Sequence, residues 1–151
     1  MMRKIVIIFS FLAVSLFLFG FEGKVLLKEY KAKNADEEKI IAALIGYEQA
    51  YNDQDKERLL SFYSADAKLT PCGEMGSQVS KADYAEKFPG KWSLYPGYMF
   101  YNPEITTMGN MAELKLNLVS GGWTVDYQIT MINENGNWMI QETFYSDPRM
   151  E

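Results

Sequence analysis

The sequence predicts one α+β domain in which a cone-shaped, strongly curved antiparallel sheet and about three N-terminal helices enclose an aromatic pocket. In the first half of the chain apolar residues recur at the spacing of a helix. After Trp92 apolar and polar residues alternate, as they do in strands. Apolar residues make up 48% of the chain and aromatic residues 15%. That content suffices for a packed core and excludes an intrinsically disordered chain.

Residues 1–23 are predicted to be a signal peptide or an N-terminal membrane anchor. Arg3 and Lys4 precede an apolar run over residues 5–21, which is somewhat short for a spanning helix. We therefore expect export to the periplasm or the extracellular space, with membrane contact only if this segment is retained. Residues 24–33 are expected to form a short basic tail, and residues 34–151 the folded domain.

The clearest predicted helix covers residues 34–52. Asn34 and Glu37 have the spacing of a capping box at its start. The residues that recur at helical spacing behind them form one apolar stripe: Ile40, Leu44, Tyr47 and Tyr51. Shorter helices are expected over residues 55–63 and from Ser80 to just before Pro89.

Strands are predicted over residues 98–107, 111–120, 123–132 and 138–145, because apolar and polar residues alternate there. Gly121 and Gly122 are expected to form a tight hairpin turn, and residues 133–137 a second turn. Pro103 predicts an edge strand or a bulge, since proline cannot donate to a sheet ladder.

Several function classes are excluded by composition. The chain has no histidine, which removes Ser-His and Cys-His nucleophile systems and histidine-ligated metals. Its net charge of −5 and its lack of a basic cluster argue against nucleic acid as a partner. Asp53, Asp55 and Glu57 begin like a calcium loop, but Arg58 stands where glycine is required. We expect no metal and no cofactor.

The chain resembles the nuclear transport factor 2-like superfamily, which includes ketosteroid isomerase-like and SnoaL-like domains and is also described as cystatin-like. Three stretches carry the resemblance: residues 40–47 continuing through 55–63, the turn Ser64-Ala65-Asp66-Ala67, and the closing strand from Gly136 to Ser146. The resemblance implies a sheet curled around a pocket that the first helix crosses, and a homodimer formed through the outer face of the sheet.

If the cone forms, its lining is expected to come from the helix stripe and from inward-facing strand positions. The candidate pocket residues are Tyr47, Tyr51, Tyr63, Trp123 and Tyr127. The alternative is that these rings simply fill the core. Buried tyrosines need a partner for the hydroxyl, so several together indicate a cavity with polar groups in its wall.

Glu142 and Asp66 are the candidate catalytic acids. In a regular strand Glu142 shares parity with Trp138, Ile140 and Phe144, and apolar surroundings would suit it to act as a base or a proton donor. The alternative is that a bulge or the rim of the pocket lets it reach water. Asp66 follows the second helix at the start of a strand, where a turn role is the alternative.

Three functions remain, and one of them is a purely structural dimer whose pocket is filled by its own side chains. The first is an exported module that binds a small apolar or amphipathic ligand or associates with itself or a partner. The second is a lyase, isomerase or cyclase acting on a small carbonyl compound, with Glu142 or Asp66 as base and a tyrosine as oxyanion donor. The single cysteine, Cys72, cannot form an internal disulfide and is either a reactive thiol or an incidental loop residue.

Overall fold

A computed structural model describes residues 23–71, 73–74, 76–90 and 92–150. The predicted targeting segment and Cys72 lie outside these residues, apart from Gly23. The helices come first and the long strands last, in the order η1 (Leu27–Glu29), α1 (Ala35–Asn52), α2 (Lys56–Ser61), β1 (Tyr63–Leu69), β2 (Val79–Ser80), α3 (Lys81–Lys87), η2 (Phe88–Gly90), β3 (Met99–Met108), β4 (Met111–Ser120), β5 (Trp123–Glu134) and β6 (Asn137–Met150).

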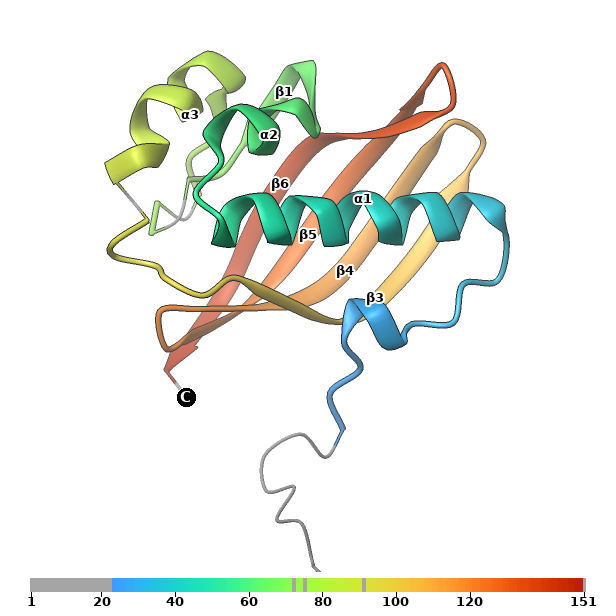
Figure 1. The fold of residues 1–151 in the computed structure, drawn as a ribbon, viewed down its shortest axis with the longest axis horizontal. Coiled ribbons are helices and arrows are strands. Elements are labelled where there is room, and N and C mark those ends of the chain that lie inside the picture. Colours follow the sequence, from blue (N-terminus) through green and yellow to red (C-terminus); the bar gives the residue numbers. More distant parts are fainter. Residues whose placement is uncertain (1–22, 72, 75, 91, 151) are drawn as a thin grey trace, which may run out of the picture.

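The strands form one six-stranded sheet in the order β2-β1-β6-β5-β4-β3. The four long strands make an antiparallel meander, whereas β1 runs parallel to β6. The sheet curves around α1, which lies across its concave face, and α2 and α3 cover the end nearest β1 (Figure 1). The predicted α+β fold with a curved sheet and three α-helices is therefore confirmed.

Helix α1 begins and packs as its sequence predicts. The Asn34 side chain accepts a hydrogen bond from the Glu37 amide at 2.9 Å, which caps the first turn. All four residues of the predicted apolar stripe are buried, with Ile40 and Leu44 completely inaccessible to solvent. Burial of this stripe against the concave face of the sheet holds α1 in place, because an isolated helix of this length is marginal in water.

Glu37 holds the segment before α1 rather than completing the capping box. Its carboxylate accepts hydrogen bonds from the Lys33 amide at 2.8 Å and the Tyr30 hydroxyl at 3.0 Å, and its side chain is almost fully buried. Burial by itself would raise the pKa of Glu37. The two hydrogen bonds and the charge of Lys33 outweigh that effect, so its pKa is lowered and the carboxylate stays ionised.

Residues 24–33, expected to be a tail, pack onto the edge of the sheet. Leu26 forms a bridge with Tyr101 of β3, and Leu27 is buried. The Val25 amide donates to the Asn102 side chain at 2.9 Å, and the Val25 carbonyl accepts from the Asn102 amide at 2.7 Å. The first described residues are therefore fixed to the start of β3.

The predicted irregularity at Pro103 is confirmed. The pairing of β3 with β4 shifts between Tyr101 and Glu104, and Asn102 adopts a left-handed backbone with φ of 53°. Strand β3 is also the edge of the sheet. The bulge therefore places the proline where no ladder hydrogen bond is required of it.

Both predicted hairpin turns form. Gly121 and Gly122 join β4 to β5 with φ angles of 59° and 80°, and Asn135 and Gly136 join β5 to β6 with φ angles of 55° and 89°. Gly121 is also a point of close approach. A Cβ there would lie 2.9 Å from the Leu94 carbonyl, and its amide donates to the Pro96 carbonyl at 2.8 Å. These contacts bind residues 92–98 to the β4–β5 hairpin.

Among the residues that the structure describes, no helix is both long and apolar enough to cross a membrane.

Candidate functional site

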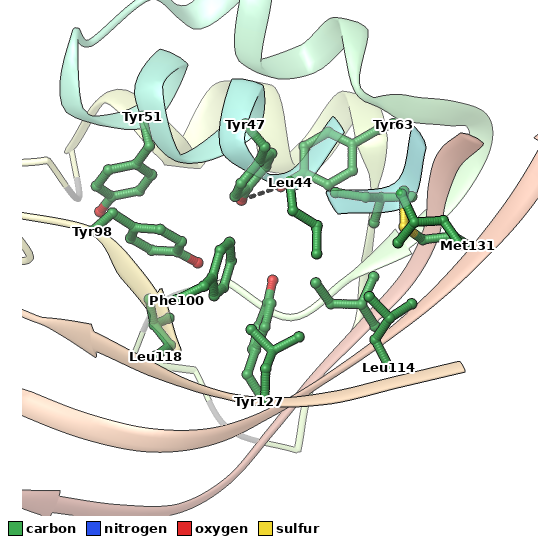
Figure 2. Packing of buried hydrophobic residues seen from close by; sticks show 14 of the residues in the cluster. Leu44, Tyr47, Tyr51, Tyr63, Tyr98, Phe100, Leu114, Leu118, Tyr127 and Met131 are labelled. Carbon is green, nitrogen blue, oxygen red and sulfur yellow. Dashed lines mark hydrogen bonds between the residues drawn. The ribbon is translucent and has the colours of Figure 1, made fainter. Parts of the chain in front are cut away.

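Tyrosine rings fill the middle of the concave face. Tyr47, Tyr51, Tyr63 and Tyr127 each expose 2% or less of their surface. Tyr47 lies at the centre of the cluster, with its ring packed against those of Phe62, Tyr63, Tyr98 and Phe100 at centroid distances between 5.6 and 6.2 Å (Figure 2). These four predicted pocket residues thus form packed core, which is the alternative that the sequence left open.

The hydroxyl groups of the cluster bond to one another and to the backbone. Tyr47 and Tyr63 share a hydrogen bond of 2.6 Å, Tyr98 and Tyr145 share one of 3.3 Å, and Tyr51 donates to the Tyr95 carbonyl at 2.8 Å. Burial raises the pKa of Tyr63 well above its usual value. The Tyr63 hydroxyl therefore stays neutral, and its role is to join α1 to β1.

A cavity of about 200 Å³ opens where the tyrosine cluster ends, beside the β4–β5 hairpin. Its lining is mainly aromatic and aliphatic and comes from the strand ends and from residues 73 and 95: Gly73, Tyr95, Leu118, Ser120, Trp123, Val125, Tyr145 and Pro148. Of the five predicted pocket residues, Trp123 is the one that lines it. Trp123 is 40% exposed, so it both lines the cavity and reaches solvent.

Strand register brings the lining residues together. Leu118 pairs with Val125, and Ser120 pairs with Trp123, so their side chains lie on the same face across the hairpin. Tyr145 of β6 packs against the ring of Tyr127 at 4.5 Å between centroids, which joins the cavity wall to the core cluster. The wall is therefore an extension of a rigid sheet face.

Tyr95 forms the wall that does not belong to the sheet. Its carbonyl accepts hydrogen bonds from the Tyr51 hydroxyl of α1 at 2.8 Å and from the Ser120 hydroxyl of β4 at 2.9 Å. These two hydrogen bonds fix the loop at Tyr95 to both α1 and β4. The Ser120 oxygen also carries lone pairs, so it can accept a hydrogen bond from a bound hydroxyl or amine.

Glu142 lies on the outer face of the sheet because of a bulge. The pairing of β5 with β6 shifts between Thr130 and Met131, and Gln141 is the extra residue in β6. Side chains after the bulge change faces, so Glu142 and Phe144 are exposed while Thr143 and Tyr145 are buried. The Glu142 carboxylate accepts a hydrogen bond from the Gln78 amide group at 2.7 Å. The bulge that the sequence left open as an alternative is therefore present, and it lets Glu142 reach water.

Asp66 is exposed on β1 and accepts a hydrogen bond from the Ser64 hydroxyl at 3.1 Å. It lines a shallow groove between β1 and β2, which shares no described lining residue with the cavity beside Trp123. The structure therefore does not bring Asp66, Glu142 and the tyrosine cluster into one site. Asp55, from the acidic run considered for calcium, caps α2 by accepting from the Arg58 amide at 3.0 Å.

Besides the predicted Trp123, three further lining residues carried a signal in the sequence, whereas Tyr95 and Tyr145 did not. Leu118 and Val125 alternate with polar neighbours, and Ser120 directly precedes the glycine turn, so all three lie on inward-facing positions near a strand end. Tyr95 lies in a loop whose path depends on contacts with Tyr51 and Ser120. Tyr145 faces inward because of the bulge in β6.

The architecture is that of nuclear transport factor 2-like proteins. A protein with a cystatin-like fold from Nostoc punctiforme has a TM-score of 0.64 at 14% identity, covering 77% of this chain and 93% of its own. A nuclear transport factor 2-like protein from Shewanella baltica has a TM-score of 0.63 at 10% identity, covering 81% of this chain and 100% of its own. The function of both is unknown.

A candidate scytalone dehydratase from Novosphingobium aromaticivorans has a TM-score of 0.60 at 12% identity, covering 77% of this chain and 87% of its own. No family model and no curated protein matches the sequence. Identities this low establish the fold and leave the function to the site itself.

Proposed function

We propose that this protein binds a small apolar or amphipathic ligand in the cavity beside Trp123. The observation that carries the proposal is the cavity itself. Its wall is mainly apolar, and it lies next to a core whose interior is filled by packed side chains. Apolar pockets with a few placed polar groups are the usual form of small-molecule sites. The partly exposed Trp123 ring forms the entrance.

The size of the cavity limits the ligand to about one ring. A cavity of roughly 150 Å³ lined by apolar side chains binds benzene, whereas drug-sized ligands occupy roughly 300–1,000 Å³. The volume of about 200 Å³ lies between these values. A substituted single-ring compound or a short branched aliphatic compound therefore fits, and a steroid or a complete lipid does not.

Ser120 gives the ligand an orientation. Its hydroxyl is nearly buried, and it already donates to the Tyr95 carbonyl. A ligand that can donate a hydrogen bond to the Ser120 oxygen should therefore bind more tightly than an apolar compound of equal size. Such a bond contributes about 0.5–1.5 kcal/mol. 4-Methylphenol and toluene are a matched pair of probes for this comparison.

The alternative, a lyase, isomerase or cyclase, has less support. A candidate scytalone dehydratase shares the fold, but one fold serves many functions. None of the described side chains that line the cavity is a carboxylate, and Glu142 and Asp66 both lie outside it. Neither acid is therefore placed to exchange a proton with a ligand held beside Trp123.

Filling the cavity with a larger side chain tests the binding proposal. Val125→Trp places a second indole in the cavity wall and is expected to abolish binding of 4-methylphenol, measured by chemical-shift changes in an NMR titration. Val119→Trp is the matched control, because Val119 lies on the same hairpin but on the opposite face of the sheet. Unchanged binding in Val125→Trp, with the fold retained, would show that the cavity is not the site.

Export and self-association belong to the same proposal. The sequence before Gly23 supports export, and the outer sheet face offers an apolar surface for pairing. There Met111 pairs across the sheet with Ile132, and Ile132 pairs with Met139. Native mass spectrometry of the protein purified from its source is expected to show a dimer. A monomer would contradict the pairing, and recovery from the cytoplasm would contradict export.

A further inference from the structure

Exposed apolar side chains gather at the end of the molecule where the cavity opens. Leu94 is 62% exposed, Trp123 40% and Met150 75%. Trp123 and Met150 are direct cross-strand partners, and Leu94 lies against the turn at Gly121. These three residues, which we call the apolar rim, surround the β4–β5 hairpin. An exposed apolar patch with polar surroundings can mark a site of contact with a membrane.

The described chain enters the fold at the same end. Val25, itself 44% exposed, pairs with Asn102 near the start of β3. Figure 1 shows the first described residues, drawn in blue before η1, on the side of the sheet that carries the β4–β5 hairpin and the end of β6. The β3–β4 hairpin, with the exposed Met108 and Met111, lies at the opposite end.

The apolar run over residues 5–21 is close along the chain to Val25, which lies at the same end of the molecule as the apolar rim. Phe21 precedes Val25 by four residues, which can span at most roughly 14 Å. A membrane that holds this run would therefore lie next to the end that carries the rim. The preceding Arg3 and Lys4 are the basic flank that such segments carry on the cytoplasmic side.

We propose that the apolar rim docks on a lipid bilayer, so that the mouth of the cavity faces the membrane. The partner is the interfacial region of the bilayer to which residues 5–21 hold the domain. Tryptophan is enriched at that depth, because its ring is apolar and its N–H is polar. Leu94 and Met150 would insert beside Trp123. An amphipathic compound dissolved in the bilayer would then reach the cavity without crossing water, a consequence that rests on the proposed function.

Charge does not drive this docking. The chain carries a net charge of −5, Arg149 beside the rim is paired with Asp126 at 2.7 Å, and the Lys24 ammonium lies 4.9 Å from the centre of the Tyr101 ring. Anionic lipids would attract a polybasic surface. The free energy gained by burying apolar side chains in the bilayer does not depend on lipid charge. We therefore expect docking on neutral phosphatidylcholine and little response to salt.

The test uses the full chain in phosphatidylcholine vesicles whose acyl chains carry bromine, which quenches tryptophan at close range. The fluorescence assigned to Trp123, taken as the difference between the unchanged protein and Trp123→Phe, is expected to be largely lost. A second variant combines Trp123→Phe with Met108→Trp, which moves an exposed tryptophan to the opposite end. Its added fluorescence is expected to persist. Unquenched Trp123, equal quenching at both ends, or failure of the chain to join the vesicles would overturn the proposal.

A further variant separates docking from ligand binding. Leu94→Asp with Met150→Asp changes two rim residues that do not line the cavity. Trp123 should then escape the bromine while 4-methylphenol still binds in the absence of vesicles. Continued quenching in this variant would overturn docking through the rim. Loss of 4-methylphenol binding in the unchanged protein would instead count against the proposed function and leave the docking result standing.

Discussion

Replacing Tyr47 by alanine is expected to lower the free energy of unfolding by about 3–5 kcal/mol, the range found when large buried aromatic residues are truncated. Tyr47 is 1% exposed, and its ring contacts the rings of Phe62, Tyr63, Tyr98 and Phe100. Its removal leaves a cavity between α1 and the sheet. Urea denaturation with linear extrapolation measures the change.

Tyr47→Phe is the matched control for this substitution. It keeps the ring contacts and removes only the hydroxyl that bonds to Tyr63 at 2.6 Å. Its cost should be about 1–3 kcal/mol, the penalty for depriving a buried polar group of a partner. If Tyr47→Ala cost less than about 1 kcal/mol, the ring could not be the centre of the packed interior.

Leu118→Ala should cost about 2–5 kcal/mol of stability and enlarge the cavity beside Trp123. Leu118 is buried and lines that cavity. The enlarged space should bind 4-propylphenol more tightly than the unchanged cavity does. A ligand at one hundred times its dissociation constant raises the free energy of unfolding by about 2.7 kcal/mol. Thermal unfolding with and without 4-propylphenol measures this recovery.

Leu116→Ala separates the ligand effect from general destabilisation. Leu116 is buried on the same strand and the same face, but it does not line the cavity. Its truncation should cost a similar free energy, and 4-propylphenol should not restore it. If 4-propylphenol restored the stability of both variants equally, the ligand would be binding to any destabilised core. If it restored the stability of neither, Leu118 would not line the binding site.

The helices and strands could be predicted because the spacing of apolar residues, the helix cap and the glycine turn depend on residues that are close together in the sequence. The stripe from Ile40 to Tyr51 needs one face to bury, and Asn34 supplies the acceptor for the first turn. The glycine turn at Gly121 joins two alternating strands whose inward sides meet α1. Each of these elements follows from side-chain spacing and backbone freedom within about twenty residues.

The site could be predicted only in part, because it depends on long-range geometry. The bulge at Gln141 changes the faces of residues 142–146 in β6, and nothing in the alternation of residues 138–145 indicates it. Glu142 thereby moves to the outer face and Tyr145 to the cavity. Whether a buried ring fills or lines a space depends on how completely its neighbours pack, which sequence spacing does not determine.

The central claim is that a single-ring amphipathic compound occupies the space bounded by Leu118, Trp123 and Tyr145. A crystal structure of the protein soaked with 4-methylphenol tests it most directly. We predict electron density for one molecule there, with its hydroxyl within hydrogen-bonding distance of Ser120. A Trp123 ring folded inward to fill that space, with no density for the compound, would contradict the claim.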